Sequence, residues 1–293
     1  MKKNLVILSL SLLIFVAPAK ASDAEFDIFA TSTIIDNQSV IPLWKGVIEL
    51  QTIHRFSLIE SHRDLFGLYA AANTRMGLAY GVSDRLMVGI GTSKFYQLQD
   101  LRWKYALLVQ NTDGSMPISL SYYGNVVVDA RASDVFGTDH ENSDFKFIHR
   151  LSYFNQFIVA RKFNDNLTLQ VAPSFIYFNA VPYYIVGTGE EAVMTKYNNF
   201  NIGMHVGGRY RVRHNHAILM EYNTLLTSQD GLSDDLKPKP ALTFGYEIGS
   251  PTHAFQLFVT NYANVIDQYN LLFNTNDFTK GKYMFGFNIV TRF

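Results

Sequence analysis

The sequence contains no cysteine in 293 residues, and beyond residue 21 it has no long apolar run. Without cysteine, a disulfide scaffold and lipid attachment at an N-terminal cysteine of a processed chain are both excluded. A membrane-spanning helix needs about 18 or more apolar residues, so none is expected after residue 21. The formal net charge is zero, which gives no support to nucleic-acid binding.

The first 21 residues have the pattern of a secretory signal peptide. Lys2 and Lys3 precede an apolar stretch from Leu5 to Ala17, and Ala19-Lys20-Ala21 is a small-x-small cleavage site. The apolar stretch is shorter than an anchoring helix requires. We therefore expect an exported chain whose mature part begins near Ser22.

What the exported part does contain is many aromatic residues, 17 Tyr and 23 Phe in the whole sequence, set in alternating segments. A tilted membrane strand needs about nine to eleven residues, with apolar and polar positions alternating. Twelve segments fit this description: 44–57, 73–82, 85–94, 100–110, 117–128, 148–160, 167–178, 198–212, 216–226, 240–248, 253–262 and 282–293.

The last of these segments is the clearest. Tyr283, Phe285, Phe287 and Ile289 share one face, while the other face is mixed and polar, and the sequence stops at Phe293. A terminal aromatic residue resembles the sorting signal that outer-membrane barrels present to the barrel assembly machinery. We expect that machinery, and outer-membrane lipids, as partners.

The links between the segments alternate in length. Short links with turn residues, such as Ser83-Asp84 and His214-Asn215, alternate with mostly longer links, although residues 95–99 form a short one. Short turns at one end and long loops at the other are typical of outer-membrane barrels. We predict an all-β, antiparallel transmembrane barrel of about 12 strands over residues 44–293, located in the cell outer membrane. Residues 22–43 have no settled period and are expected to form a periplasmic arm, a plug or an extra strand.

A family resemblance supports this fold. Its residues are Ile53-His54-Arg55-Phe56, Leu65-Phe66-Gly67-Leu68, the stretch from Thr74 to Gly81, and Val88-Gly89-Ile90-Gly91. These resemble an uncharacterised outer-membrane β-barrel family of Bacteroidota, a domain-of-unknown-function group. The resemblance implies an outer-membrane barrel with no known activity, and it supplies no catalytic residues.

The polar faces of the predicted strands carry more basic than acidic side chains. The candidate pore-lining residues are Arg55, Arg75, Arg102, Lys104, Arg150, His205, Arg209, Arg211, Glu49, Glu221 and Glu247. Fixed cations on a low-dielectric wall attract anions and repel cations. This favours a porin-like channel for small anionic solutes.

Two other functions remain open at this stage. In a closed barrel, the same cations would pair with lumen acids and a folded-in segment, such as 22–42 or 58–72, and the protein would act as a scaffold or bind a partner. A lipid-modifying enzyme would need a His and a Ser in reach of each other. His54 with Ser57, and His149 with Ser152, lie on opposite faces of their strands because their spacing is odd. We therefore expect no enzymatic activity, and no metal or cofactor.

Overall fold

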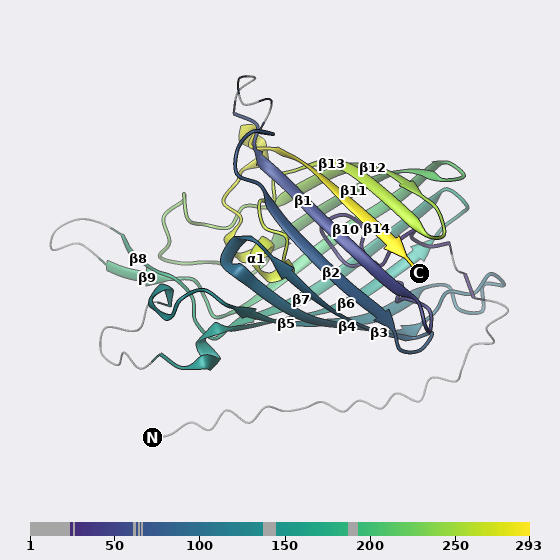
Figure 1. The fold of residues 1–293 in the computed structure, drawn as a ribbon, viewed down its shortest axis with the longest axis horizontal. Coiled ribbons are helices and arrows are strands. Elements are labelled where there is room, and N and C mark those ends of the chain that lie inside the picture. Colours follow the sequence, from purple (N-terminus) through teal and green to yellow (C-terminus); the bar gives the residue numbers. More distant parts are fainter. Residues whose placement is uncertain are drawn as a thin grey trace.

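In a computed structural model, twelve strands close into one antiparallel barrel (Figure 1). The structure describes residues 24–25, 27–60, 63, 65, 67–136, 145–186 and 193–293, so the expected signal peptide lies outside the described residues. The wall strands are β1 (Ile48–Leu58), β2 (Asn73–Gly81), β3 (Leu86–Ser93), β4 (Leu98–Leu108), β5 (Ser119–Asp129), β6 (Leu151–Lys162), β7 (Leu167–Phe178), β10 (Phe200–Arg213), β11 (His216–Leu225), β12 (Ala241–Gly249), β13 (His253–Thr260) and β14 (Met284–Arg292).

The predicted fold is confirmed, and each of the twelve segments overlaps one wall strand, with bounds that differ by at most four residues. The barrel is closed where β1 pairs with β14, for example at Glu49 and Arg292. The backbone groups of Ile48 and Phe293 extend this seam with two hydrogen bonds of 3.1 and 2.9 Å. Closure matters because backbone polar groups inside lipid have no water to bond to.

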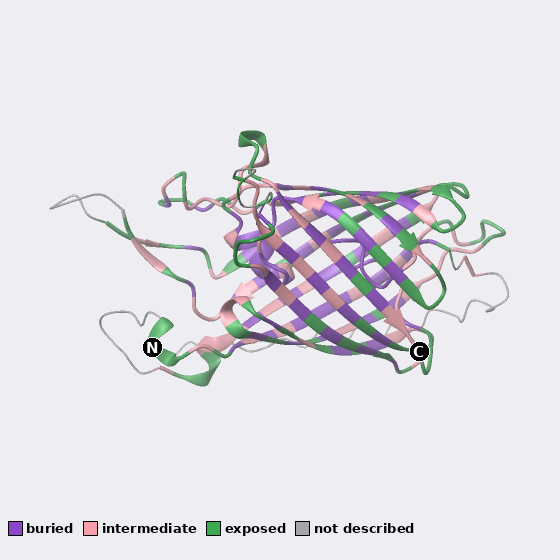
Figure 2. Cartoon of the chain, turned by 45° about the horizontal axis from the view of Figure 1, so that its top comes forward, coloured by how far each residue is buried: buried purple, intermediate pink, exposed green. Residues whose placement is uncertain are grey.

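Buried and exposed residues alternate along the strands, as Figure 2 shows. The outward positions are apolar, for example Met76 and Leu257, which are 63% and 53% exposed. The inward positions are largely polar, for example Gln51 and Asn288, which are buried. The apolar face therefore meets lipid and the polar face meets the lumen, as a membrane barrel requires. No helix within the described residues has the length and apolarity of a membrane span.

The two ends of the barrel differ. We call the end with tight links, such as the link from β10 to β11, the short-turn end, and the opposite one the long-loop end. A hairpin of β8 (Tyr183–Val186) and β9 (Val193–Lys196) forms a separate sheet and projects from the long-loop end (Figure 1). Residues 179–197 lie between two predicted strands, so the sequence predicts a loop there. The strands β8 and β9 are missed because they are too short to show a clear alternation.

Residues 27–43, which we call the plug, lie inside the barrel. The plug is a loop whose tip is closed by a bridge between Thr33 and Gln38 and by a hydrogen bond of 2.7 Å from Ile34 N to Asn37 O. The apolar side chains of Ile28, Ile34 and Val40 are buried. Both ends of the plug lie at the short-turn end, where the chain continues into β1.

One glycine lets the chain leave the plug close to the wall. At Gly81 of β2, a Cβ atom would lie 1.8 Å from the carbonyl oxygen of Trp44, so a larger residue would collide with the backbone there. The neighbouring turn is held by a hydrogen bond of 2.8 Å from Gly46 N to Gly81 O.

A second segment enters the lumen from the long-loop end. It is the helix α1 (Asp267–Phe273), in the link between β13 and β14, and its residues from Gln268 to Leu272 are buried. The expectation that residues 58–72 could fold into the lumen is wrong for the part that is described. Tyr69, for example, is 77% exposed.

Two positions on β10 test the membrane-facing side of the wall. Val206 and Val212 are both outward-facing, 49% and 44% exposed, but Val206 is in the middle of the strand and Val212 is near its end. We expect Val206→Arg to cost about 2–4 kcal/mol of folding free energy in lipid vesicles, and the control Val212→Arg about 0–1 kcal/mol. Denaturant titration in vesicles measures both. Equal costs would contradict the assigned membrane depth.

Candidate functional site

The structure places most of the predicted pore-lining residues together on the inner wall. Nine are buried there: Glu49, Arg55, Arg75, Arg102, Lys104, His205, Arg209, Glu221 and Glu247. Two lie apart, because Arg211 is at the short-turn end of β10 and Arg150 is at the long-loop end, just before β6. Eight of these nine belong to one polar network with the plug, while His205 bonds only Asn223 among the described residues, at 3.1 Å.

Some of the predicted cations pair with acids of the wall itself. Arg75 of β2 forms a two-pronged ion pair with Asp100 of β4, with N–O distances of 2.8 and 2.6 Å. Arg209 of β10 lies 3.0 Å from Glu247 of β12. Such pairs are needed because an unpaired buried charge is costly.

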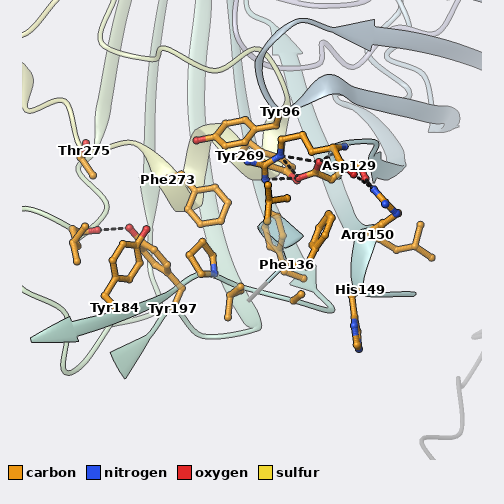
Figure 3. A pocket seen from close by; sticks show the side chains of 18 residues that line it. Tyr96, Asp129, Phe136, His149, Arg150, Tyr184, Tyr197, Tyr269, Phe273 and Thr275 are labelled. Atoms are coloured by element: carbon orange, nitrogen blue, oxygen red, sulfur yellow. Dashed lines mark hydrogen bonds and ion pairs between the residues drawn. The ribbon is translucent and has the colours of Figure 1, made fainter. Parts of the chain in front are cut away.

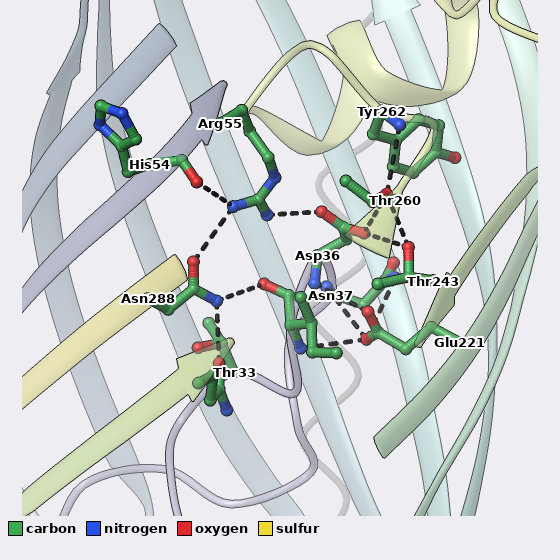
Figure 4. Close-up of polar contacts among 12 residues, drawn as sticks. Thr33, Asp36, Asn37, His54, Arg55, Glu221, Thr243, Thr260, Tyr262 and Asn288 are labelled. Carbon is green, nitrogen blue, oxygen red and sulfur yellow. Dashed lines mark hydrogen bonds and ion pairs between the residues drawn. The ribbon is translucent and has the colours of Figure 1, made fainter. Parts of the chain in front are cut away.

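Two carboxylates hold the tip of the plug (Figure 4). Asp36 of the plug accepts from Arg55 at 2.6 Å and from the hydroxyls of Thr243 and Thr260 at 2.6 and 3.1 Å. Glu221 of β11 accepts from the backbone N–H groups of residues 35, 36 and 37, at 3.3, 2.8 and 3.3 Å. The tip is therefore bound to β1, β11, β12 and β13, which lie on one stretch of the barrel wall.

Further wall side chains bind the backbone of the plug. The ammonium group of Lys104 donates to the carbonyl oxygens of Ser32 and Ile41, at 2.6 and 3.2 Å. Asn288 donates to Ile35 O at 3.0 Å, and Gln170 donates to Gln38 O at 2.8 Å. The interface between plug and wall thus combines hydrogen bonds and ion pairs with apolar contacts, since Ile28, Ile34 and Val40 belong to a buried apolar cluster that includes wall residues.

The charged side chains of residues 24–43 are all acidic. Residues 24–43 contain three acids, Glu25, Asp27 and Asp36, and no Lys or Arg. Each acid pairs with a wall cation. Glu25 lies 2.9 Å from Lys162, Asp27 contacts Arg209 and Arg211, and Asp36 binds Arg55. The segment thus supplies counter-charge to a basic wall.

Several buried polar atoms of the lumen have no hydrogen-bond partner within the described part of the chain. For Arg102 they are Nε and one terminal nitrogen, and its other terminal nitrogen donates to Gln51 at 3.1 Å. The rest lie mainly on adjacent strands β6, β7, β10 and β11, and include atoms of Gln156, Ser174, His205 and Asn223. Each such group weakens the closed arrangement by about 1–3 kcal/mol.

Helix α1 closes the lumen above the plug. Its first residue, Asp267, accepts hydrogen bonds from the hydroxyl of Tyr123 and the amide of Asn125, both at 3.0 Å. Gln268 donates to Asn125 at 3.0 Å. In the sequence Asp267 lies in a long link between two predicted strands, but in the structure its carboxylate faces inner-wall residues of β5.

The sequence analysis did not identify the acids Asp36, Asp100 and Asp267 as site residues. Asp100 could have been predicted from the sequence, because it shares the inward face of a predicted strand with Arg102 and Lys104. Nothing comparable marked Asp36, because the segment around it shows no periodicity. The basic surplus expected for an open lumen is therefore offset in the structure by acids from the plug and from the wall.

Two cavities lie at the ends of the filled lumen. The one at the short-turn end has about 590 Å³ and is lined mainly by apolar residues of the plug and of nearby strands, including Phe29, Leu43 and Leu108. At the long-loop end, the cavity that is lined by aromatic and charged residues has about 290 Å³. The polar network and α1 lie between them.

Asp267 makes the docking of α1 sensitive to pH. Burial of its carboxyl group raises its pKa to about 6, and the hydrogen bond from Tyr123 and the charges of Arg102 and Arg75 oppose this shift. The docked carboxyl group thus binds its proton more tightly than a free aspartate, whose pKa is about 3.9. Docking should gain about 2 kcal/mol as the pH falls through 6 toward 4, and lose it as the pH rises.

Asp267→Asn removes this charge, and the amide oxygen of the asparagine can still accept a hydrogen bond. We expect slower amide hydrogen exchange of residues 268–272 at pH 7.5, and little change from the original protein at pH 4. The control is Asp277→Asn in the same loop, where Asp277 caps a short 3₁₀ turn and is exposed. Unchanged exchange at pH 7.5 in Asp267→Asn would contradict the assigned cost of the charge.

Several solved structures are similar to this chain, at low sequence identity and with TM-scores under 0.5. Among solved structures, the NanC porin has a TM-score of 0.49 and 8% identity, over 82% of this chain and 98% of that one. An outer-membrane channel of Pseudomonas putida F1 has 0.45 and 11%, over 87% and 98%. OmpT, an outer membrane protein of Vibrio cholerae, has 0.39 and 10%, over 86% and 99%.

A search of curated proteins finds no significant match. The model of one protein family, in contrast, matches residues 29–293, which include the whole wall and all but the first two residues of the plug. The expected origin in Bacteroidota stays a prediction. The protein is a membrane β-barrel, and it belongs to the family described as "Membrane bound beta barrel domain (DUF5777)".

Proposed function

We propose that this protein is a gated channel for small anionic solutes, closed by its plug in the state described here. The observation that carries the proposal is the one-sided charge of residues 24–43, whose three acids all pair with cations of the wall. These carboxylates occupy places on a basic wall that anions in transit would take in the open state.

Withdrawal of the plug would change the charge of the lumen. Arg55, Lys162 and Arg211 would lose carboxylate partners supplied by residues 25–36, and Lys104 would lose two carbonyl acceptors. Cations fixed on a low-dielectric wall attract anions and repel cations. The open lumen would therefore favour small anions such as carboxylated sugars.

The nature of the interface supports a plug that can leave. Each neutral hydrogen bond between plug and wall contributes only about 0.5–1.5 kcal/mol net, and each bond to a charged group about 1.5–3 kcal/mol, because water replaces it when the plug departs. Water would also satisfy the lumen atoms that have no partner in the closed state.

The direction of withdrawal follows from the topology. Both ends of the plug lie at the short-turn end, and the link of residues 44–47 joins it to β1. In an outer-membrane barrel the short turns face the periplasm. The plug would therefore withdraw toward the periplasm, while α1 would move with the outer loops.

The filled lumen favours one alternative, a closed barrel that serves as a scaffold or binds a partner. In that case the plug would be a permanent part of the interior. The two functions differ in what happens when the plug is loosened.

Loosening variants test the channel. Asp36→Ala removes the partner of Arg55, and Glu221→Ala removes the acceptor of three backbone N–H groups at the tip. In planar bilayers under a salt gradient, we expect both variants to open at least tenfold more often than the original protein, with an anion-selective reversal potential. Asp100→Ala is the matched control, because it removes a buried lumen carboxylate that binds Arg75 and not the plug.

A labelling measurement shows whether the plug moves. The sequence has no cysteine, so Ser39→Cys, at a buried plug position, gives a single thiol for a water-soluble maleimide. We expect faster labelling when Asp36→Ala or Glu221→Ala is added. Faster labelling with no conductance would overturn the channel in favour of the closed barrel. Cation-selective conductance would overturn the proposed solute class.

A further inference from the structure

The cavity at the long-loop end combines a wall of aromatic rings with an unusual arginine. Its volume of about 290 Å³ is at the lower edge of the range for small-molecule sites. In Figure 3 the rings of Tyr184, Tyr197 and Phe273 lie at one side, and Asp129 and Arg150 lie at the other, with Phe136 between them. The cavity is separate from the polar network around the plug.

The aromatic wall is held in place by its own contacts. Phe273 of α1 packs edge-on against Phe178 and Tyr197, with ring centroids 5.3 and 5.1 Å apart. Tyr269 packs against Phe178 at 5.2 Å and against Tyr96 at 5.3 Å. Edge-to-face contacts of this kind favour fixed ring orientations, so the wall is formed before any ligand arrives.

The two arginines of the cavity differ in how their charge is balanced. The charge of Arg131 is neutralised by Asp129, with which it forms an ion pair at N–O distances of 3.0 and 2.6 Å. Arg131 also lies over the ring of Tyr96. Arg150 pairs with no carboxylate of the described residues. One of its terminal nitrogens donates to two backbone carbonyls, of Asp129 at 2.7 Å and of Arg131.

This arrangement leaves one edge of Arg150 for a ligand. A guanidinium group has five N–H donors, and the two on that terminal nitrogen are used by the carbonyls. Nε and the other terminal nitrogen form the fork that binds a carboxylate through two parallel hydrogen bonds. No group of the described residues accepts from this fork. The guanidinium also lies 5.2 Å from the ring centre of Phe136 and 4.9 Å from that of Phe145, which limits its movement.

We propose that this cavity binds a small carboxylate with a flat apolar body, such as an aromatic carboxylic acid, with the carboxylate on Arg150 and the body against the aromatic wall. The proposal deepens the proposed function, because it names a class of anion that the channel would collect at its outer end, and it rests on that function only for transport. Binding at the cavity can be measured without conductance.

Benzoate is the probe, and isothermal titration calorimetry of the full chain in detergent is the measurement. We expect one benzoate per barrel, bound at least tenfold more tightly than acetate, which lacks the ring, or benzyl alcohol, which lacks the charge. Arg150→Gln should weaken benzoate binding at least tenfold. Arg150→Lys should weaken it by a similar factor, because a lysine keeps the charge but has no fork.

Arg161→Gln is the matched control, because Arg161 lies over a ring, that of Phe163, at 5.2 Å but at the short-turn end, away from the cavity. Phe136→Leu is a second variant. It removes one ring beside Arg150 and leaves the hydrogen bonds from Arg150 to the carbonyls of Asp129 and Arg131 in place. It should weaken benzoate severalfold and leave acetate unchanged.

The outcomes separate this inference from the proposed function. Benzoate binding that is no tighter than acetate binding, or that survives Arg150→Gln unchanged, would overturn the site whatever the conductance shows. If benzoate binding depends on Arg150 but the barrel shows no conductance after loosening of the plug, the binding site stands and the proposed channel function is overturned.

Discussion

The structure depends first on the need to pair every backbone polar group inside a lipid bilayer. That need closes twelve strands into a ring and joins β1 to β14 at residues that are far apart in sequence. It also sets the alternation of side chains, because every second residue must face lipid. The polar residues of the sequence are thereby concentrated on the inner face, and the lumen becomes the place where their charges have to be balanced.

The balance is achieved by two loops that enter from opposite ends. The plug comes from the short-turn end with acids that match wall cations, and α1 comes from the long-loop end with Asp267. Both loops also contribute apolar side chains to one buried cluster with wall residues. The interior is consequently held both by polar bonds that water can replace and by apolar packing.

The sequence was sufficient to predict the wall, and insufficient to predict what fills it. A strand such as 167–178 shows a period of two that lipid on one side enforces, so its bounds could be read directly. Asp36 shows no such signal, because its role comes from contacts with Arg55, Thr243 and Thr260, which are remote in sequence. Arg150 was counted with the pore because its sign fitted, although its position near a strand end places it at the mouth. The short hairpin β8–β9 was missed because four residues are too few to reveal an alternation.

The position of the plug ahead of β1 has a consequence for the order in which the molecule assembles. The groups that bind the plug tip include Glu221 and Asn288, which follow it in the chain by 185 and 253 positions when counted from Asp36 and Ile35. The plug is synthesised before the wall, and it therefore completes its contacts only when the final strand is in place. The lumen is thus fully occupied only once the barrel is complete. In a chain that stalls before β14, the seam between β1 and β14 would be unpaired and the basic lumen would lack the full set of plug contacts.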